Sequence, residues 1–267
     1  AGLGTRLLPL TSVFAKELLP INGKPGLEYI LDECIEAGIK EVIFIISKKK
    51  MMIKKYFYND KFYKDIIKKK GDPKIIKEYK KILKYKKMIK FVFQDKPLGT
   101  GDAVYKTKKF ITDKYFLMLL PDDLIIKKNC SKSMILVHKK FKASVMASMK
   151  VNKSDVTRWG IYNIKKKIDK NNFIINNVVE KPSIKTSPSN NAVIGRYILP
   201  KTIFSKLKSL KPGKSGEFHI TDAIQALIED DHQFIGHNFS GKYLDCGTMN
   251  GYIKSTLEIS KQWNFAW

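Results

Sequence analysis

KPGLEYILDECIEAGIKEVIFIIS, residues 24–47, joins a helical pattern directly to an apolar run. Apolar residues recur at helical spacing over residues 24–40, where Pro25 suits the first turn and Gly38 suits the C-terminal cap. The run at 41–47 is almost entirely apolar, which is the pattern of a parallel strand buried on both faces. A helix followed by a buried strand indicates a layered α/β fold.

The rest of the chain continues this alternation of helices and strands. Residues 48–88 are rich in lysine and predict helices with basic outer faces, with a link near residues 71–73, as an excursion from the core. No flexible linker or internal repeat divides the chain, so we expect a single domain over residues 1–267. Further strands are predicted at 90–94, 115–123, 143–151, 159–164, 173–181 and 191–199, a short strand pair at 233–245, and helices at 102–110, 201–210, 219–231 and 248–262.

Composition narrows the classes of protein to which the chain can belong. Its 267 residues are enough for a sizeable core, and 43% of them are hydrophobic. No apolar run approaches the roughly 20 residues of a membrane-spanning helix, so we expect no membrane partner. The cysteines, Cys34, Cys130 and Cys246, are odd in number and widely spaced, which disfavours disulfides and zinc and favours a reducing cytoplasm.

The net charge of +26 invites a nucleic-acid interpretation. However, only three of the 51 basic residues are arginines, namely Arg6, Arg158 and Arg196, and lysines occur along the whole chain. Dedicated nucleic-acid binders usually rely on the bidentate geometry of arginine. We therefore favour solvated lysine faces over an electrostatic footprint, and we expect no specific nucleic-acid partner.

The opening stretch AGLGTRLLPL, residues 1–10, holds a glycine-rich turn. It lacks the third glycine of the dinucleotide-binding fingerprint and the GK[ST] ending of a P-loop, so alone it would more often be a plain turn. Arg6 follows directly, and Lys16 lies shortly after, in FAKELLP. A nest of backbone N–H groups with two cations nearby predicts a cradle for a triphosphate.

Carboxylates stand where predicted strands end. Asp122 and Asp123 close the strand predicted at 115–123, and Asp245 precedes Gly247 and a helix. In open α/β sheets ligands bind at the carboxyl ends of strands, and Mg²⁺ prefers a few carboxylates together with phosphate oxygens. We favour Asp122 as a metal ligand and a capping or supporting role for Asp123. The alternative for these carboxylates is a helix N-cap.

Three polar side chains are candidates for contacts with a sugar or a base. Glu180 and Lys181 end the strand predicted at 173–181, where a glutamate can accept hydrogen bonds from two sugar hydroxyls and a lysine can hold a phosphate. Gln94 ends KFVFQ and could read a base edge through its amide. The plainer alternatives are an exposed ion pair for the first two and a surface glutamine for the third.

The order of these motifs is far more specific than any one of them. From the N-terminus the chain carries GLGTRLLPLT, AKELLPI, FVFQ with PLGTGDAV, LPDD, WGIY, VVEKP, AVIGRYIL, GEFHITDAI and YLDCGTMNGYIKS. This series spans nearly the whole chain and resembles the bacterial UTP–glucose-1-phosphate uridylyltransferases, a branch of the sugar-1-phosphate nucleotidylyltransferases. The resemblance implies a Rossmann-like α/β fold with a mixed, mostly parallel sheet. It also implies Mg²⁺-dependent conversion of UTP and glucose 1-phosphate into UDP-glucose and pyrophosphate.

The resemblance implies roles for individual residues as well. Residues 1–125 would mainly bind the nucleotide and 126–267 mainly the sugar. Two cations would hold the triphosphate and act in catalysis, while an amide and a glycine would read the base. The implied nucleotide contacts are Gly2, Leu3, Gly4, Thr5, Arg6, Lys16, Gln94 and Gly99; the metal ligands are Asp122 and Asp245; and the sugar-phosphate contacts are Gly160, Glu180, Lys181 and Gly195.

The chain also departs from the family pattern. Members reach the glycine loop from a short apolar strand that does not precede Gly2 here, so the resemblance implies an N-terminal truncation. We expect residues 1–6 to be disordered, or activity to be low and rescued by restoring that strand. Residues that differ from the usual motifs are Ser12, Ala15, Gly26, Thr100 and Asp102, of which Thr100 and Asp102 bear on the choice of base.

Other functions compete with this interpretation. A thymidylyltransferase, or another nucleotidylyltransferase acting on a sugar 1-phosphate, would use the same chemistry, and a catalytically inactive nucleotide-binding protein would keep only the loop. The family commonly forms dimers or tetramers, so we expect a homo-oligomer. The C-terminal aromatic residues Trp263, Phe265 and Trp267 could form an interface or pack on the core.

Overall fold

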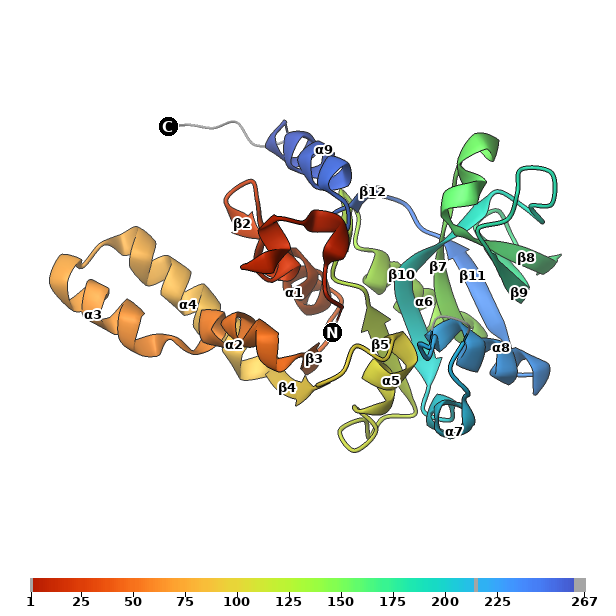
Figure 1. Ribbon diagram of the computed structural model, residues 1–267, viewed down its shortest axis with the longest axis horizontal. Helices are drawn as coiled ribbons and strands as arrows, with labels where there is room; N and C mark the ends of the chain where they lie inside the picture. The colour runs from red at the N-terminus through yellow and green to blue at the C-terminus, as the bar shows by residue number, and fades with distance from the viewer. Residues whose placement is uncertain (1, 214–215, 262–267) are drawn as a thin grey trace.

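The centre of the molecule is a six-stranded sheet in the order β5-β10-β7-β11-β9-β8 (Figure 1). The computed structural model describes residues 2–213 and 216–261; the aromatic cluster at 263–267 therefore lies outside the described residues. The strands of this sheet are β5 (Tyr115–Leu119), β7 (Ser144–Lys150), β8 (Gly160–Lys167), β9 (Asn172–Glu180), β10 (Asn191–Pro200) and β11 (Phe234–Asn238).

The sheet is mixed, which confirms the predicted α/β class. However, most of its strand pairs are antiparallel, whereas a mostly parallel sheet was expected. Only β7 and β11 run parallel in it. The strand β10 runs against both β5 and β7, and β8 and β9 form an antiparallel hairpin. The strand β8 also touches β10 through the pair Ala192–Ile161, so five of the strands curl towards closure.

Helices cover both faces of this sheet because neighbouring residues of its strands point to opposite sides. Met146 packs with the helices α7 (Ile203–Ser209) and α8 (Ile220–Glu229). Its neighbours Val145 and Ala147 pack with α6 (Cys130–Phe141) on the other side. The helix α6 was not predicted. The helix α5 (Thr100–Tyr105) begins earlier and ends sooner than the prediction at 102–110.

The helix and strand predicted from residues 24–47 are confirmed. They are α1 (Gly26–Glu36) and β3 (Val42–Ile46), and β3 pairs in parallel with β4 (Ile89–Phe93). Pro25 ends the two-residue strand β2 (Lys24–Pro25), which pairs with β1 (Pro20–Ile21), so it precedes α1 instead of lying in its first turn. Gly38 closes the turn after α1 with a φ of 83°.

The lysine-rich segment is an excursion only in part. It forms α2 (Met51–Tyr58), α3 (Asp60–Lys70) and α4 (Pro73–Met88). The helices α2 and α4 bury Phe57 and Tyr85 against β3 and α1, whereas α3 has no fully buried residue. Figure 1 shows α3 and the adjoining part of α4 extending away from the sheet.

A small separate sheet determines where the carboxylates meet. The strand predicted at 115–123 ends at Leu119, and a second strand, β6 (Asp123–Ile126), begins after the turn. It pairs antiparallel with β12 (Lys242–Asp245), so that Asp123 lies opposite Asp245. The predicted pairing of the two strands within 233–245 is therefore wrong, because β11 joins the large sheet. The helix α9 (Met249–Ser260) follows β12.

The helices within residues 2–213 and 216–261 do not include a membrane span. None of them is both long enough and apolar enough to cross a bilayer.

Candidate active site

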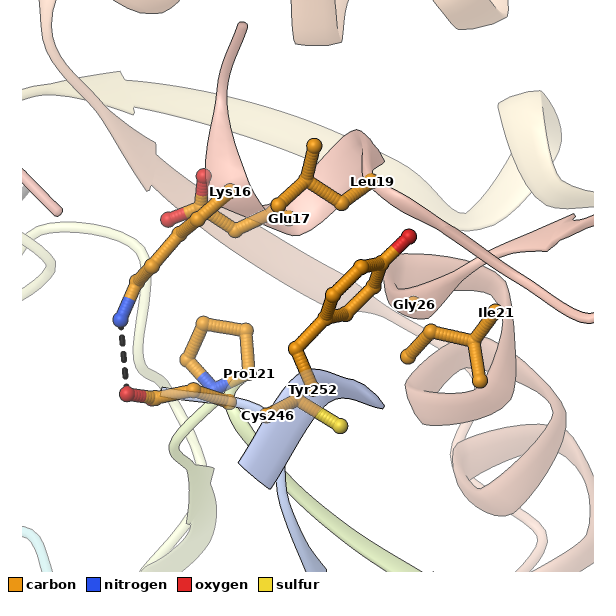
Figure 2. Close-up of a pocket in the computed structure, with 9 residues that line it drawn as sticks. Lys16, Glu17, Leu19, Ile21, Gly26, Pro121, Cys246 and Tyr252 are labelled. Carbon is orange, nitrogen blue, oxygen red and sulfur yellow. Dashed lines mark hydrogen bonds and ion pairs between the residues drawn. The ribbon is translucent and has the colours of Figure 1, made fainter. Parts of the chain in front are cut away.

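Two cations from the N-terminal segment converge on one oxygen of Asp122. The Lys16 ammonium donates to Asp122 Oδ2 at 2.7 Å, an interaction drawn as the dashed line in Figure 2. The Arg6 guanidinium lies 3.7 Å from the same oxygen. Lys16 begins the short helix η3 (Lys16–Leu18), and Asp122 lies in the turn between β5 and β6. These residues belong to separate sequence motifs, and the fold brings them together.

The electrostatics of the two adjacent aspartates differ. Burial would raise the pKa of Asp122, but Lys16 and then Arg6 outweigh it and the pKa is lowered. Burial and the neighbouring Asp122 carboxylate raise the pKa of Asp123. Asp123 accepts hydrogen bonds from the Tyr243 hydroxyl and from the Gly195 N–H, each at 2.8 Å. Asp123 thus binds Tyr243 and the backbone of β10, whereas Asp122 faces the cations; the supporting role expected for Asp123 stays a prediction.

Asp245 and Gly247 complete the same corner of the molecule. The Asp245 Oδ1 accepts the Gly247 N–H at 2.8 Å at the start of the turn into α9. A Cβ added to Gly247 would lie 2.8 Å from Asp122 Oδ2, 3.0 Å from Arg6 Nη2 and 3.2 Å from Asp245 Oδ1. Both carboxylates and the guanidinium therefore surround one point that only a glycine leaves open. Figure 2 shows the neighbouring pocket, with Pro121, Cys246 and Tyr252 beside the ion pair of Lys16.

The donor set at this corner suits a magnesium ion that also binds phosphate. No group of three His, Cys, Asp or Glu side chains comes together within the described ranges. Two carboxylates do, with oxygens within 3.2 Å of the point above Gly247. Mg²⁺ often binds through one or two carboxylates, with the remaining positions taken by water and substrate phosphates. Asp122 and Asp245 therefore fit such an ion, provided that Lys16 moves from Asp122.

The structure describes the glycine loop from Gly2 onward, and Ala1 lies outside the described residues; the disorder expected for residues 1–6 stays a prediction. Gly4 adopts a φ of 73°, and its carbonyl accepts the Thr11 hydroxyl at 2.7 Å. Leu7, which follows the loop, is fully buried in the protein interior. These local contacts hold the exposed backbone of Gly2, Leu3 and Thr5 in place.

Gln94 and Gly99 are neighbours, but Gln94 is not the surface residue of the plainer alternative. It is 1% exposed, and its Nε2 donates to the Gly99 carbonyl at 3.0 Å and to Asp102 Oδ2 at 2.8 Å. Both acceptors lack a hydrogen to give, so they determine the orientation of the amide. The contact with Asp102 was not predicted, although Asp102 stood out as a departure from the family pattern.

The residues predicted for the sugar lie on three neighbouring strands. Gly160 on β8 pairs with Glu180 on β9, and a Cβ on Gly160 would lie 3.0 Å from Glu180 Oε2. Lys181 is exposed, with its ammonium 4.0 Å from Glu180 Oε1. On β10, Gly195 is tied to the Asp122–Asp123 turn through Asp123 and through its carbonyl, which accepts the Leu120 N–H at 2.8 Å.

The structure also contains a buried ion pair between α1 and β10. Arg196 is 0% exposed and binds Glu33 of α1 with its Nη2 2.8 Å from Oε2. Its guanidinium donates to the carbonyls of Leu120 and Asp123. Arg158, by contrast, is exposed and lies 3.8 Å from Asp155.

Known proteins are similar to this chain in sequence and in fold. The chain matches the nucleotidyl transferase family over residues 1–262. It is 34% identical to the putative UTP–glucose-1-phosphate uridylyltransferase of Methanocaldococcus jannaschii over 262 residues, which is 98% of this chain and 91% of that protein. It is 35% identical to the UTP–glucose-1-phosphate uridylyltransferase of Bacillus subtilis over 263 residues, which is 98% of this chain and 89% of that protein.

Solved structures agree with these relatives. A UDP-glucose pyrophosphorylase complexed with UDP-glucose has a TM-score of 0.85 and 32% identity, covering 98% of this chain and 97% of that one. The UTP-bound UGPase from Acinetobacter baumannii has a TM-score of 0.89 and 29% identity, covering 99% of this chain and 92% of that one. The family match and the fold place the chain among the nucleotidyl transferases. Within that class, the chain belongs to the UTP–glucose-1-phosphate uridylyltransferase family.

Proposed function

We propose that this chain transfers UMP from UTP to glucose 1-phosphate, giving UDP-glucose and pyrophosphate, with Mg²⁺ as cofactor. The observation that carries the proposal is the convergence of Arg6, Lys16, Asp122 and Asp245 around Gly247. At this place, two cations that can bind a triphosphate lie next to two carboxylates that can bind the metal ion of that triphosphate. The relatives that share 34% and 35% of their residues with this chain bear the name of this activity.

The reaction needs positioning and charge stabilisation more than proton transfer. An oxygen of glucose 1-phosphate is already anionic at neutral pH and attacks the α-phosphorus of UTP in line. The new O–P bond forms as the bond from the α-phosphorus to the bridging oxygen breaks, and pyrophosphate leaves. No general base is required, so the work of the protein is to align two polyanions and to offset the charge that develops on the leaving group.

The described residues divide this work between them. Arg6 and Lys16 would bind the leaving β- and γ-phosphates, and the exposed N–H groups of the glycine loop would add further donors. Asp122 and Asp245 would hold Mg²⁺, which when bound supplies Lewis-acid stabilisation of phosphate charge. Gln94 and Gly99 would orient the base. Glu180 would accept sugar hydroxyls, with Gly160 and Gly195 leaving room for the ring and Lys181 steering its phosphate.

The proposal also covers the compartment and the oligomeric state of the protein. Cys34, Cys130 and Cys246 are all buried and free in the described structure, which suits the reducing cytoplasm expected from the sequence. The expected homo-oligomer, a dimer or a tetramer, stays a prediction. Light scattering of the purified chain would measure its mass directly.

Removal of the metal tests the cofactor. With UTP and glucose 1-phosphate present, we expect pyrophosphate release in Mg²⁺ and a loss of at least about a hundredfold when EDTA is in excess, because the two carboxylates then face the triphosphate without a bridging cation. Restoring free Mg²⁺ should restore the rate. Equal rates with and without EDTA would contradict the metal assignment.

Replacing Lys181 should weaken the binding of glucose 1-phosphate and leave the binding of UTP unchanged. We expect Lys181→Ala to raise KM for glucose 1-phosphate roughly tenfold with KM for UTP unchanged, because one charge-assisted contact to its phosphate is lost. Steady-state kinetics with each substrate varied in turn would measure the split. Lys185→Ala removes another exposed lysine of the same loop and serves as the matched control. An equal effect of the two substitutions would reduce the role of Lys181 to general surface charge.

A further inference from the structure

Asp122 is paired with a cation of the protein itself. Its Oδ2 lies 2.7 Å from the Lys16 ammonium, and both side chains are mostly shielded, with exposed fractions of 16% for Lys16 and 18% for Asp122. Arg6 reaches the same oxygen only at 3.7 Å, and its side chain is 65% exposed. Lys16 thus makes the close contact, whereas Arg6 contributes charge from a distance.

That contact uses the same oxygen that faces the metal corner. Asp122 Oδ2 and Asp245 Oδ1 lie on the same side of Gly247, at 2.8 and 3.2 Å from the position that a Cβ on this glycine would take. A metal ion that bridged these two oxygens would meet the oxygen to which Lys16 donates. A metal ion on that oxygen would repel the Lys16 ammonium, so each of the two cations weakens the binding of the other.

The backbone around Lys16 is fixed, so only its side chain can leave. The next residue, Glu17, accepts the Lys50 ammonium through both carboxylate oxygens, at 2.7 and 2.9 Å, and Lys50 is itself buried. On the C-terminal side, the Leu19 carbonyl accepts the Gly26 N–H at the start of α1. A lysine has a flexible four-carbon stem, so its ammonium can move between two anions while η3 stays in place.

We propose that Lys16 is a built-in counter-cation that occupies Asp122 and keeps a metal ion away until a nucleoside triphosphate draws the lysine off. This inference rests on the proposed function for the identity of the polyanion. Once Lys16 turns to the phosphates, Asp122 is released for the metal. Metal and nucleotide then favour each other's binding, and the coupling is reciprocal. Metal without nucleotide would bind weakly, because Lys16 already balances the charge of Asp122.

The inference is tested by metal binding without any nucleotide or turnover. Mn²⁺ serves as the probe, and free Mn²⁺ is followed by electron paramagnetic resonance during titration of the full chain. We expect Lys16→Met, which keeps the length of the side chain and removes its charge, to bind Mn²⁺ about tenfold more tightly than the unsubstituted chain. Adding Asp122→Asn to Lys16→Met should abolish that gain.

Two further variants separate direct occupation from a change in overall charge. Arg6→Met removes a charge that lies 3.7 Å from Asp122 Oδ2 on a mostly exposed side chain, and Lys90→Met removes one from a surface pair with Glu41. We expect each to change the Mn²⁺ affinity by about twofold or less. The proposal is overturned if Lys16→Met binds Mn²⁺ no better than the unsubstituted chain, or if Arg6→Met gives the same gain.

The titration separates this inference from the proposed function. It contains no substrate, so its result is the same whether the chain prefers UTP, prefers dTTP or is inactive. If the gain in Lys16→Met persists when Asp122 is also replaced, the metal is not held by Asp122. That result would overturn both this inference and the metal assignment, while leaving the transfer reaction itself to the kinetic assay.

Discussion

Replacing Asp122 with alanine is expected to lower kcat/KM for UDP-glucose formation by about a thousandfold, the upper end of the effect of losing one preorganised charge contact. Asp122 is the point where Lys16, Arg6 and the corner above Gly247 meet. Without its carboxylate, the metal ion would lose a ligand, and Lys16 and Arg6 would lose the anion that holds them ready for the triphosphate.

The control for this prediction is Asp65→Ala, because Asp65 is exposed on α3, far from the sheet. It should retain kcat/KM within roughly twofold, and both variants should show cooperative thermal unfolding, since surface substitutions seldom change stability by more than about 0.5 kcal/mol. Comparable activity of the Asp122 and Asp65 variants would mean that the chemistry takes place elsewhere.

Replacing Arg196 with methionine is expected to lower the free energy of unfolding by about 4 kcal/mol, because it leaves a charged Glu33 buried without its partner. Arg196 is fully buried, and it also binds the carbonyls of Leu120 and Asp123 on either side of Asp122. The substitution should therefore loosen the turn that carries Asp122 as well as the junction between α1 and β10. Urea denaturation measures the loss.

Two variants make this stability prediction specific. Arg158→Met removes an exposed arginine and should cost about 0.5 kcal/mol or less. Replacing Glu33 with leucine in the Arg196→Met background should recover part of the loss, since no unpaired charge would then be buried. If Arg196→Met unfolds at the same urea concentration as Arg158→Met, the buried pair does not hold this turn.

The sequence anticipated those parts of the fold that depend on local patterns. The 3.6-residue spacing before Gly38 and the apolar run after it predicted α1 and β3 with the correct order and nearly the correct bounds. It did not anticipate that β12 pairs with β6 instead of β11, because the register of strands far apart in the chain leaves no mark in either strand alone. That pairing is what places Asp245 beside Asp122.

The candidate site shows the same division. The residue types at Arg6, Lys16 and Asp122, each within its own short motif, indicated phosphate or metal chemistry. The contact between Lys16 and Asp122 joins residues 106 positions apart in the chain. The contact between Arg196 and Glu33, which supports the same turn, joins residues 163 positions apart. Such contacts depend on the packing of α1 and η3 against the β5–β6 turn. Spacing in the sequence cannot reveal that packing.

The central claim, uridylyl transfer to glucose 1-phosphate, is tested most directly by comparing UTP and dTTP in one assay. The purified chain is supplied with Mg²⁺ and glucose 1-phosphate, and the nucleotide sugar formed is separated and quantified for each nucleotide. We expect UDP-glucose to form with a kcat/KM at least about tenfold above that for dTTP, equivalent to about 1.4 kcal/mol of discrimination. A higher kcat/KM with dTTP, or no nucleotide sugar with either, would contradict the assignment.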